Sequence, residues 1–496
     1  MRESFGAAFF QRRDLILAIV LAWVLIFARN AVFVFYPQSF FDSDQAIVGL
    51  MAKHLIEGRA FPLFFYGQTY LLGVEAWVIA LFFLVGGPTV AMLHTATMSI
   101  SLATAALLIA GLVRWCGLAP FQALAASLFF TLMPPWTSAL LIEANGANAE
   151  PFLYVLLLWL LRDRPVWFGL ILGIGVLNRE FTIYAVPALL AVQLATGTLF
   201  QADRARRWLA AAAVFAMVWL AVGALKPYAD IAGPGTRGRP LPANSTVSNL
   251  LDRTAIVPSD LPARGAAMLR EYFPRQIGAR RNDSGAAPQG RDWLYWPTML
   301  GLLAAFARVV QRGWASRAHQ AGPTTVFGWY LLAIGLLSAF GYALTREVTE
   351  EPTDRYMLLV LYAPVAIVAM LLALERQVWV RRGAVVLVVA WAAISTIDHA
   401  RLFSRYWSGE GDPAQALADG LEARGVRVAA AGYWRAYKLT FLTRERVKIS
   451  STDVSRIEEY DRLAEQEGER LIVMQTQPCE SDLEPINGWY LCRAGK

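Results

Sequence analysis

Charged residues are scarce in this chain: they fill 17% of its 496 positions, whereas 56% are hydrophobic, including 17 Trp and 27 Phe. So few charges exclude an ordinary soluble enzyme and indicate a polytopic membrane protein. The net charge of +7 calls for no nucleic acid partner, because the arginines cluster in short loops between apolar segments.

Cysteine is equally scarce. Three Cys are too few for a disulfide scaffold or a zinc site. Cys116 lies in a short loop, whereas Cys479 and Cys492 both lie in the C-terminal tail. That pair forms a disulfide if the tail is outside the cytoplasm and stays as two thiols otherwise, and the sequence leaves both alternatives open.

The chain also lacks a signal peptide with a small-residue cleavage site, so its first apolar segment is expected to be retained. Apolar segments then recur at 15–36, 71–86, 90–113, 119–136, 151–161, 166–177, 181–200, 208–227, 294–310, 324–344, 356–374 and 384–400. If segment 71–86 does not cross, every basic cluster falls on one side of the membrane. We therefore predict an interfacial or re-entrant helix at 71–86 and about eleven transmembrane helices, with the N-terminus in the cytoplasm and the C-terminus outside.

Four connections reach the outer side in this topology, at roughly 37–89, 137–150, 228–293 and 345–355. All four are richer in polar and charged residues than a bare turn requires. The third is unusually long and is rich in Pro, Gly and Arg, which is rare without a function.

After residue 400 the composition changes. We predict a transmembrane catalytic domain over 1–400 and a soluble α/β domain over 401–496 on the outer side. The domain has short apolar runs at Val426–Ala431, Val447–Ile449 and Leu471–Met474, separated by polar helical stretches. It lacks a G-x-G-x-x-G motif and a P-loop, so it is assigned no nucleotide.

Two carboxylates, Asp42 and Asp44, follow the first apolar segment, at the point where it emerges on the outer side. Ionisable groups at a membrane face are functional candidates. An aspartate here acts as a general base, binds a divalent cation through its oxygens, or simply caps the following helix. No further ligand stands nearby, so the cation alternative rests on this pair alone.

The second outer connection adds Glu143 and Glu150, with Pro151 suited to the first turn of the next helix. These acids are predicted to position an acceptor hydroxyl. For Glu150, helix capping is an equal alternative.

Arginines at the same face suit an anionic ligand, because guanidinium binds phosphate in a bidentate manner and stays charged. The candidates for binding a donor phosphate are Arg179, Arg346 and Arg355. The alternative is that each pairs with its neighbouring acid, Glu180, Glu347 or Asp354.

An aromatic strip in the first outer connection contains Tyr66, Gln68 and Tyr70. Such residues stack on a sugar and bond its hydroxyls. They also occur in the aromatic belts of membrane interfaces, which is the alternative.

With these motifs, the chain resembles the GT-C superfamily of membrane glycosyltransferases, which includes protein O-mannosyltransferases, the lipid A aminoarabinose transferase and the oligosaccharyltransferase catalytic subunit. The resemblance covers roughly 15–400. It rests on the acidic segment 42–44 with its following helix, the aromatic loop 66–70, the second acidic loop, and Arg355-Tyr356 before a late apolar span.

The resemblance implies an inverting transfer of a sugar from a polyprenyl-phosphate carrier to a glycan, lipid or protein acceptor on the outer face of a bacterial inner membrane, on the periplasmic side. Asp44 would be the general base, with Asp42 beside it. Arg355 and Arg179 would bind the carrier phosphate, and Glu150 would orient the acceptor. No cofactor is expected to be required; an oligosaccharyltransferase-like cation at Asp42 and Asp44 is the alternative.

Two differences from the family limit which residue roles can be assigned to this chain by resemblance. Gln45 stands where many relatives have Glu, and the Lys-Pro-Pro of the aminoarabinose enzyme's first loop is missing, so its phosphate contact and its substrates do not transfer. The competing hypothesis is a transporter or flippase of a lipid-linked glycan. Against it, the chain has no internal repeat, and its charges lie in loops instead of within spans.

Overall fold

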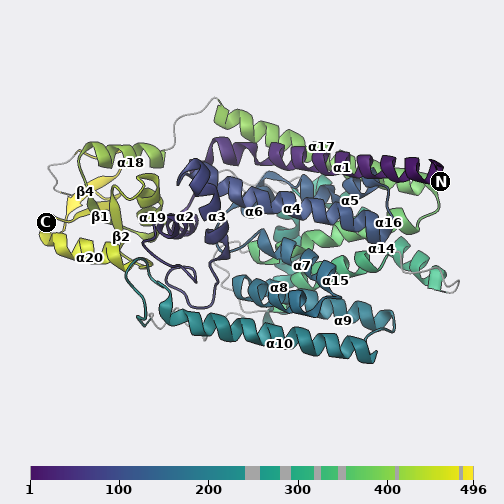
Figure 1. Cartoon of the computed structure of the whole chain (residues 1–496). Helices are drawn as coiled ribbons and strands as arrows, with labels where there is room; N and C mark the ends of the chain where they lie inside the picture. Colours follow the sequence, from purple (N-terminus) through teal and green to yellow (C-terminus); the bar gives the residue numbers. More distant parts are fainter. Residues whose placement is uncertain are drawn as a thin grey trace.

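The computed structural model describes residues 2–240, 257–279, 292–317, 325–344, 354–407, 413–479 and 484–494. Figure 1 shows long helices lying side by side in a bundle, with a small α/β domain at one end and the N-terminus at the other. The short helices α2 (Ser43–Ile56) and α3 (Val74–Gly86) lie between the bundle and this domain.

In the part of the chain that the structure describes, seven helical stretches are long and apolar enough to cross a membrane. They belong to α1 (Arg2–Phe35), α4 (Val90–Cys116), α10 (Ala202–Leu225, continued by η3, Lys226–Tyr228), α14 (Asp292–Arg317), α15 (Val326–Leu344), η7 (Asp354–Leu361) with α16 (Tyr362–Leu374), and α17 (Val378–Trp407). The bent pair α5 (Pro120–Thr131) and α6 (Pro135–Ile142) makes an eighth. The chain is therefore an integral membrane protein by the length and composition of its helices.

The predicted count of about eleven transmembrane helices includes three apolar helices that are only 10–17 residues long in the structure. These are α7 (Glu150–Leu161), α8 (Pro165–Asn178), and η2 (Glu180–Tyr184) with α9 (Ala185–Ala195). The segment expected not to cross, 71–86, forms α3, which is also short.

Proline sets several helix boundaries in the bundle. Pro120, Pro135 and Pro165 each begin a helix, at positions where the missing N–H leaves no hydrogen bond unmade. Pro134 and Pro135 also prevent α5 from continuing into α6, and the two helices meet at 81°. This bend places the start of the second acidic loop at the outer end of the bundle.

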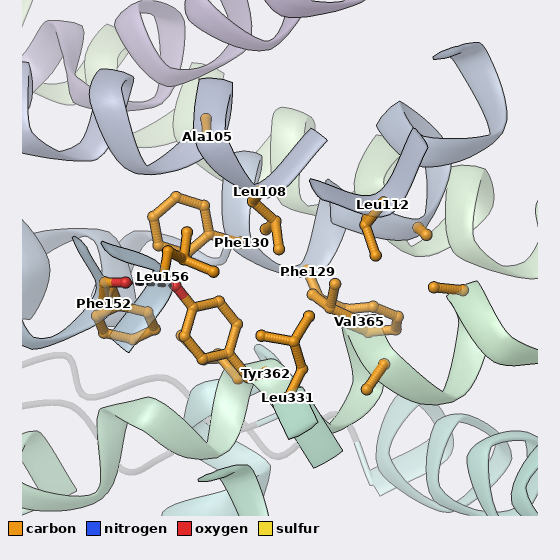
Figure 2. Packing of buried hydrophobic residues seen from close by; sticks show 14 of the residues in the cluster. Ala105, Leu108, Leu112, Phe129, Phe130, Phe152, Leu156, Leu331, Tyr362 and Val365 are labelled. Carbon is orange, nitrogen blue, oxygen red and sulfur yellow. Dashed lines mark hydrogen bonds between the residues drawn. The ribbon is translucent and has the colours of Figure 1, made fainter. Parts of the chain in front are cut away.

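The bundle core is built from α4, α5, α7, α15 and α16. Figure 2 shows Leu108, Phe130, Leu331 and Val365 packed around the Tyr362 ring. The Tyr362 hydroxyl donates to the Phe152 carbonyl at 2.8 Å, which satisfies a buried polar group that would otherwise cost about 1–3 kcal/mol.

The long outer connection between α10 and α14 contains short helical pieces in its described part. These are η5 (Pro258–Asp260), α12 (Leu261–Ala267), the π-helical turn η6 (Met268–Tyr272) and α13 (Phe273–Gln276). Another single turn, η1 (Pro37–Phe40), links α1 to α2.

The C-terminal domain has the predicted α/β character. A four-stranded sheet has the order β2 (Lys448–Ser451), β1 (Val428–Ala431), β3 (Ile472–Gln475) and β4 (Tyr490–Arg493). Strand β1 is parallel to both β2 and β3, with Ala430 opposite Ser450 and Val473, whereas β4 is antiparallel to β3. The helices of the domain are α18 (Pro413–Ala423), α19 (Tyr433–Leu442) and α20 (Glu458–Glu467), followed by the turn η8 (Gly468–Arg470).

Cys479 and Cys492 form a disulfide, with their Cα atoms 6.0 Å apart. The bond ties β4 to the segment that follows β3. The structure thus selects one of the two alternatives that the sequence left open.

Helix α19 packs directly against α2, and the Phe441 ring of α19 lies against Gly49. A Cβ atom at Gly49 would lie 2.5 Å from a ring carbon of Phe441, so a larger residue fits only if that ring moves. The aromatic side chains of Phe41, Tyr433 and Tyr437 complete the apolar contact.

We expect Gly49→Ala to weaken the attachment of the C-terminal domain by about 1–3 kcal/mol, because the added methyl group overpacks the contact with the Phe441 ring. Thermal unfolding in detergent would measure this change. The matched control is Gly223→Ala in α10, where a Cβ meets no atom within 4 Å. Equal behaviour of the two variants would contradict the close-packing argument.

Candidate active site

The 42–44 segment begins α2, and its first acid caps the helix. Asp42 Oδ1 accepts a hydrogen bond from the Gln45 backbone N–H at 2.9 Å. The capping alternative therefore holds for Asp42, which also remains half-buried beside a cavity. Gln45 turns its side chain inward, where its Oε1 lies 2.9 Å from His94 Nε2.

Ser43 and Asp44 contact the C-terminal domain instead of solvent. Ser43 Oγ donates to the Tyr433 carbonyl at 2.6 Å and accepts from the Lys438 N–H at 3.2 Å. The Tyr433 hydroxyl donates to Asp44 Oδ1. Burial and the Asp44 charge raise the pKa of Tyr433, so Tyr433 stays a hydrogen-bond donor to the carboxylate. The hydroxyl leaves Asp44 Oδ2 available to other partners.

A buried ionic cluster around Glu445 makes a second connection between α2 and the domain. Glu445 pairs with Lys53, with His54 Nε2 at 3.1 Å and with Arg59 Nη1 at 2.9 Å. The Tyr460 hydroxyl adds a fourth donor at 3.0 Å. Burial alone would raise the pKa of Glu445, but the hydrogen bonds and charges of His54 and Lys53 lower it well below its ordinary value.

Asp42 and Glu143 line one cavity of about 480 Å³. Burial and the Asp44 charge raise the pKa of Asp42 to about 6. Burial and the Asp42 charge raise the pKa of Glu143 to about 8. Asp42, Asp44 and Glu143 thus form a group of interacting carboxyls, and Arg355 supplies positive charge to all three.

Arg355 and Arg179 lie together beside the Tyr356 ring. The two guanidinium carbons lie 5.1 and 5.0 Å from the centroid of the Tyr356 ring, and both side chains line one small cavity. That cavity is about 10 Å³, enough for one water. A phosphate is larger, so its binding would require the side chains around the cavity to move.

The alternative partner of Arg179 was its neighbour Glu180. Both residues lie in the described part of the chain, and no ion pair joins them there. Arg355 donates to the Tyr356 hydroxyl at 3.2 Å, and the Asp354 side chain lies outside the described side chains. Arg346 lies outside the described residues as well, so its predicted role stays a prediction.

Glu150 is buried at the start of α7, near a second buried acid, Glu75, that the sequence analysis did not select. Glu75 accepts hydrogen bonds from the Gly146 and Ala147 N–H groups at 3.0 and 3.2 Å. Glu150 makes no comparable bond through its carboxylate oxygens. The charge of Arg179 acts on both acids, so the second acidic loop lies against the arginine pair.

The three residues of the aromatic strip have different surroundings. Tyr66 is fully buried, and its hydroxyl lies 3.1 Å from His54 Nδ1, within the cluster around Glu445. Tyr70 is half-buried beside the same packing. Gln68 has a buried Oε1 without a hydrogen-bond partner, which leaves an acceptor for a ligand hydroxyl. Gln68 therefore has a buried polar atom without a partner among the described residues.

Tyr433 and Glu445 contact the predicted site and were absent from the predicted site residues. Both lie almost 400 positions from α2 in sequence, and nothing local in the C-terminal domain indicates that they meet it. Residues Arg444 and Glu445 have positive φ, at 51° and 64°, which is visible only in the structure.

The metal alternative finds little support in the donor set. Among the described residues, no group of three or more His, Cys, Asp or Glu side chains is arranged to hold an ion. Asp44 already accepts from Tyr433, and Arg355 supplies the positive charge that a cation would bring. These residues do not fit a three-ligand site.

No family model and no curated protein matches this sequence. The structure is similar to the crystal structure of ArnT from Cupriavidus metallidurans bound to undecaprenyl phosphate, with a TM-score of 0.56 and 11% identity, over 93% of this chain and 92% of that chain. It is also similar to the apo crystal structure of the Archaeoglobus fulgidus oligosaccharyltransferase, with a TM-score of 0.50 and 11% identity, over 93% and 69% of the two chains. The predicted GT-C resemblance is confirmed at the level of the fold.

We expect Glu143→Gln to gain stability over the native chain as pH rises from 5 to 8. The raised pKa means that the folded Glu143 keeps its proton up to about pH 8, whereas the unfolded carboxyl ionises near pH 4.3, so native stability falls across this window. The Gln variant should lose this slope, and its apparent melting temperature relative to the native chain should rise by about 2 °C or more. The exposed Glu465→Gln serves as control, and parallel curves for Glu143→Gln and the native chain would contradict the assignment.

Proposed function

We propose that this protein is an inverting glycosyltransferase that moves a sugar from a polyprenyl-phosphate carrier to an acceptor hydroxyl at the outer, periplasmic face of a bacterial inner membrane. The observation that carries the proposal is the position of the acidic group. Asp42 and Glu143 line a cavity of about 480 Å³, and Asp44 follows Asp42 in the first turn of α2. Arg355, which lines another cavity with Arg179, acts electrostatically on all three carboxyls. A base in this position can reach both an acceptor and a phosphate-bearing donor.

The arginine pair is the proposed site for the carrier phosphate. Guanidinium groups form charge-assisted, bidentate bonds to phosphate and stay charged at a membrane boundary. The phosphate is also the leaving group, so two adjacent cations would stabilise the charge that develops on it. The similarity to the crystal structure of ArnT bound to undecaprenyl phosphate supports this assignment for the carrier class.

Asp44 is the proposed general base. Its free carboxylate oxygen would accept the acceptor hydroxyl proton while that oxygen attacks the anomeric carbon. One bond forms from the acceptor oxygen to the anomeric carbon, and the bond from that carbon to the phosphate oxygen breaks. The polyprenyl phosphate leaves, and a single displacement inverts the anomeric centre. Tyr433 would hold the carboxylate in place through its hydrogen bond.

The remaining predicted residues have supporting roles in this proposal. Asp42 and Glu143 would contact the acceptor from the cavity wall, and Gln68 would offer its unpaired amide oxygen to a sugar hydroxyl. Glu150 lies against Arg179 and would orient that guanidinium more directly than the acceptor. No cofactor enters the mechanism.

Asp44→Asn should lower sugar transfer by about 100-fold or more, because general-base catalysis contributes on that scale. Purified protein in lipid would be incubated with radiolabelled polyprenyl-phosphate sugars and membrane extracts that contain acceptors, with and without chelator. Asp419→Asn, on the exposed face of α18, is the matched control. Transfer at the native rate by Asp44→Asn would exclude Asp44 as the base, and label crossing vesicles without leaving its carrier would indicate a transporter.

Arg355→Ala should raise the apparent KM for the polyprenyl-phosphate donor about tenfold or more, since it removes charge-assisted bonds to the phosphate. The measurement is initial rate against donor concentration, with Arg470→Ala as an exposed control. An unchanged donor KM together with normal folding would contradict the phosphate assignment.

A further inference from the structure

Arg456 belongs to the C-terminal domain and lies in its contact with the membrane domain, yet the proposed mechanism gives it no role. It lies in the connection between β2 and α20. Its guanidinium carbon is 5.9 Å from the centroid of the Tyr433 ring and 5.7 Å from that of Phe65, a residue of the first outer connection. Arg456 therefore contacts both the tyrosine that bonds Asp44 and the loop that contains the aromatic strip.

Contacts on several sides fix the position of Arg456. Its backbone N–H donates to the Tyr437 hydroxyl, and its Nη1 donates to the Gly67 carbonyl at 3.4 Å. A Cβ atom at Gly67 would lie 2.8 Å from Arg456 Cδ, and the φ angle of Gly67 is 77°, a conformation that favours glycine. The glycine of the aromatic loop thus leaves room for the arginine beside Tyr433.

The charge of Arg456 acts on the Tyr433 hydroxyl. The acids Glu458 and Glu459, which follow in α20, pair with arginines of other segments. Burial and the Asp44 charge raise the pKa of Tyr433, whereas the charge of Arg456 and a hydrogen bond from it lower that pKa. The guanidinium therefore faces the same phenol oxygen that donates to Asp44.

A guanidinium, a phenol and a carboxylate thus follow one another in space. The single proton of the Tyr433 hydroxyl lies in the hydrogen bond to Asp44 Oδ1. Positive charge at the phenol oxygen makes the O–H a stronger donor, because hydrogen bonds in a chain polarise one another. A stronger bond restrains the Asp44 carboxylate more tightly, so its Oδ2 keeps one orientation.

Direct contact with the substrate is the alternative role for Arg456. It lines neither the cavity of about 480 Å³ beside Asp42 nor the small cavity of the Arg179–Arg355 pair. Its side chain instead contacts Phe65, Gly67 and Tyr433. These contacts favour an effect that reaches the site through Tyr433.

We propose that Arg456 is a positioning residue for sugar transfer, which acts through the Tyr433 hydroxyl to hold the Asp44 carboxylate in its productive orientation. The C-terminal domain then supplies two side chains to the site, one that bonds the base and one that strengthens this bond. The assignment of Asp44 as the base rests on the proposed function, whereas the contact of Arg456 with Tyr433 does not.

Initial rates would be measured with the radiolabelled polyprenyl-phosphate sugars for Arg456→Met, Arg456→Lys, Tyr433→Phe and the double variant Arg456→Met with Tyr433→Phe. We expect kcat to fall about tenfold in Tyr433→Phe and at least about threefold in Arg456→Met, with the donor KM unchanged. Arg456→Lys retains the charge and should recover part of the loss. The double variant should be no slower than Tyr433→Phe, because Arg456 acts through the hydroxyl.

Arg435→Met is the matched control, because the Arg435 guanidinium carbon lies 5.2 Å from the centroid of the Trp489 ring in the same domain. It should keep the native kcat. Additive losses in the double variant would overturn the action through Tyr433. A raised donor KM with native kcat in Arg456→Met would overturn the positioning role in favour of substrate binding.

A spectroscopic measurement tests the contact without turnover. The chain would carry ¹³C at the Cζ atom of its tyrosines, and the Tyr433 signal would be assigned by its loss in Tyr433→Phe. We expect this signal to shift in Arg456→Met and in Asp44→Asn and to keep its native position in Arg435→Met. If Arg456→Met does not fold, Arg456→Lys is read in its place, since lysine lacks the planar donor group of arginine.

An unmoved Tyr433 signal in the folded Arg456 variant would overturn the contact itself. A shifted signal in a protein that transfers no sugar would confirm the contact and overturn the proposed function, and with it the role of Arg456 in transfer. The two failures are therefore distinguishable.

Discussion

The packing of α19 on α2 is the contact on which the rest of the site depends. It positions Tyr433 on Asp44 and Ser43 on the α19 backbone, while the Glu445 cluster joins the same two parts a few turns further along. Neither α2 nor the C-terminal domain alone fixes the position of Asp44. Helix α2 begins at the acids, with Asp42 as its N-cap, and the C-terminal domain supplies the Tyr433 hydroxyl that bonds Asp44. Because Gly49 has no side chain, the Phe441 ring of α19 can lie directly against α2.

Opposing effects set the pKa values of the acidic group. Burial and the charge of neighbouring carboxyls raise the pKa values of Asp42 and Glu143, whereas the charge of Arg355 lowers them. The resulting pKa values are about 6 for Asp42 and about 8 for Glu143, and both residues line one cavity. Such values near neutrality are typical of acid–base sites. Arginine suits the cation beside this group, because a lysine would shift its own pKa more readily on burial.

Much of the fold and part of the site followed from sequence patterns. Long apolar runs are the strongest local signal, so the membrane helices and the α/β tail were predictable, and the order of acidic and basic loops located Asp42, Asp44, Glu143, Arg179 and Arg355. Three short helices were counted as spans because apolar composition alone does not give helix length, which prolines such as Pro165 limit. Helix α19 and strand β4 were missed, since their mixed sequences have weak periodicity. The roles of Tyr433 and Glu445 arise from tertiary contacts that no local pattern encodes.

The hydrogen bond between Asp44 and Tyr433 joins residues 389 positions apart in the chain. During synthesis at about 5–20 residues per second, the aspartate is made roughly 20–80 s before its partner. The nascent membrane bundle therefore contains the proposed base long before the group that orients it. A chain that ends before α19 would hold the Arg179–Arg355 pair and the acids, yet would lack the restraint on Asp44. Completion of the site is thereby linked to completion of the polypeptide.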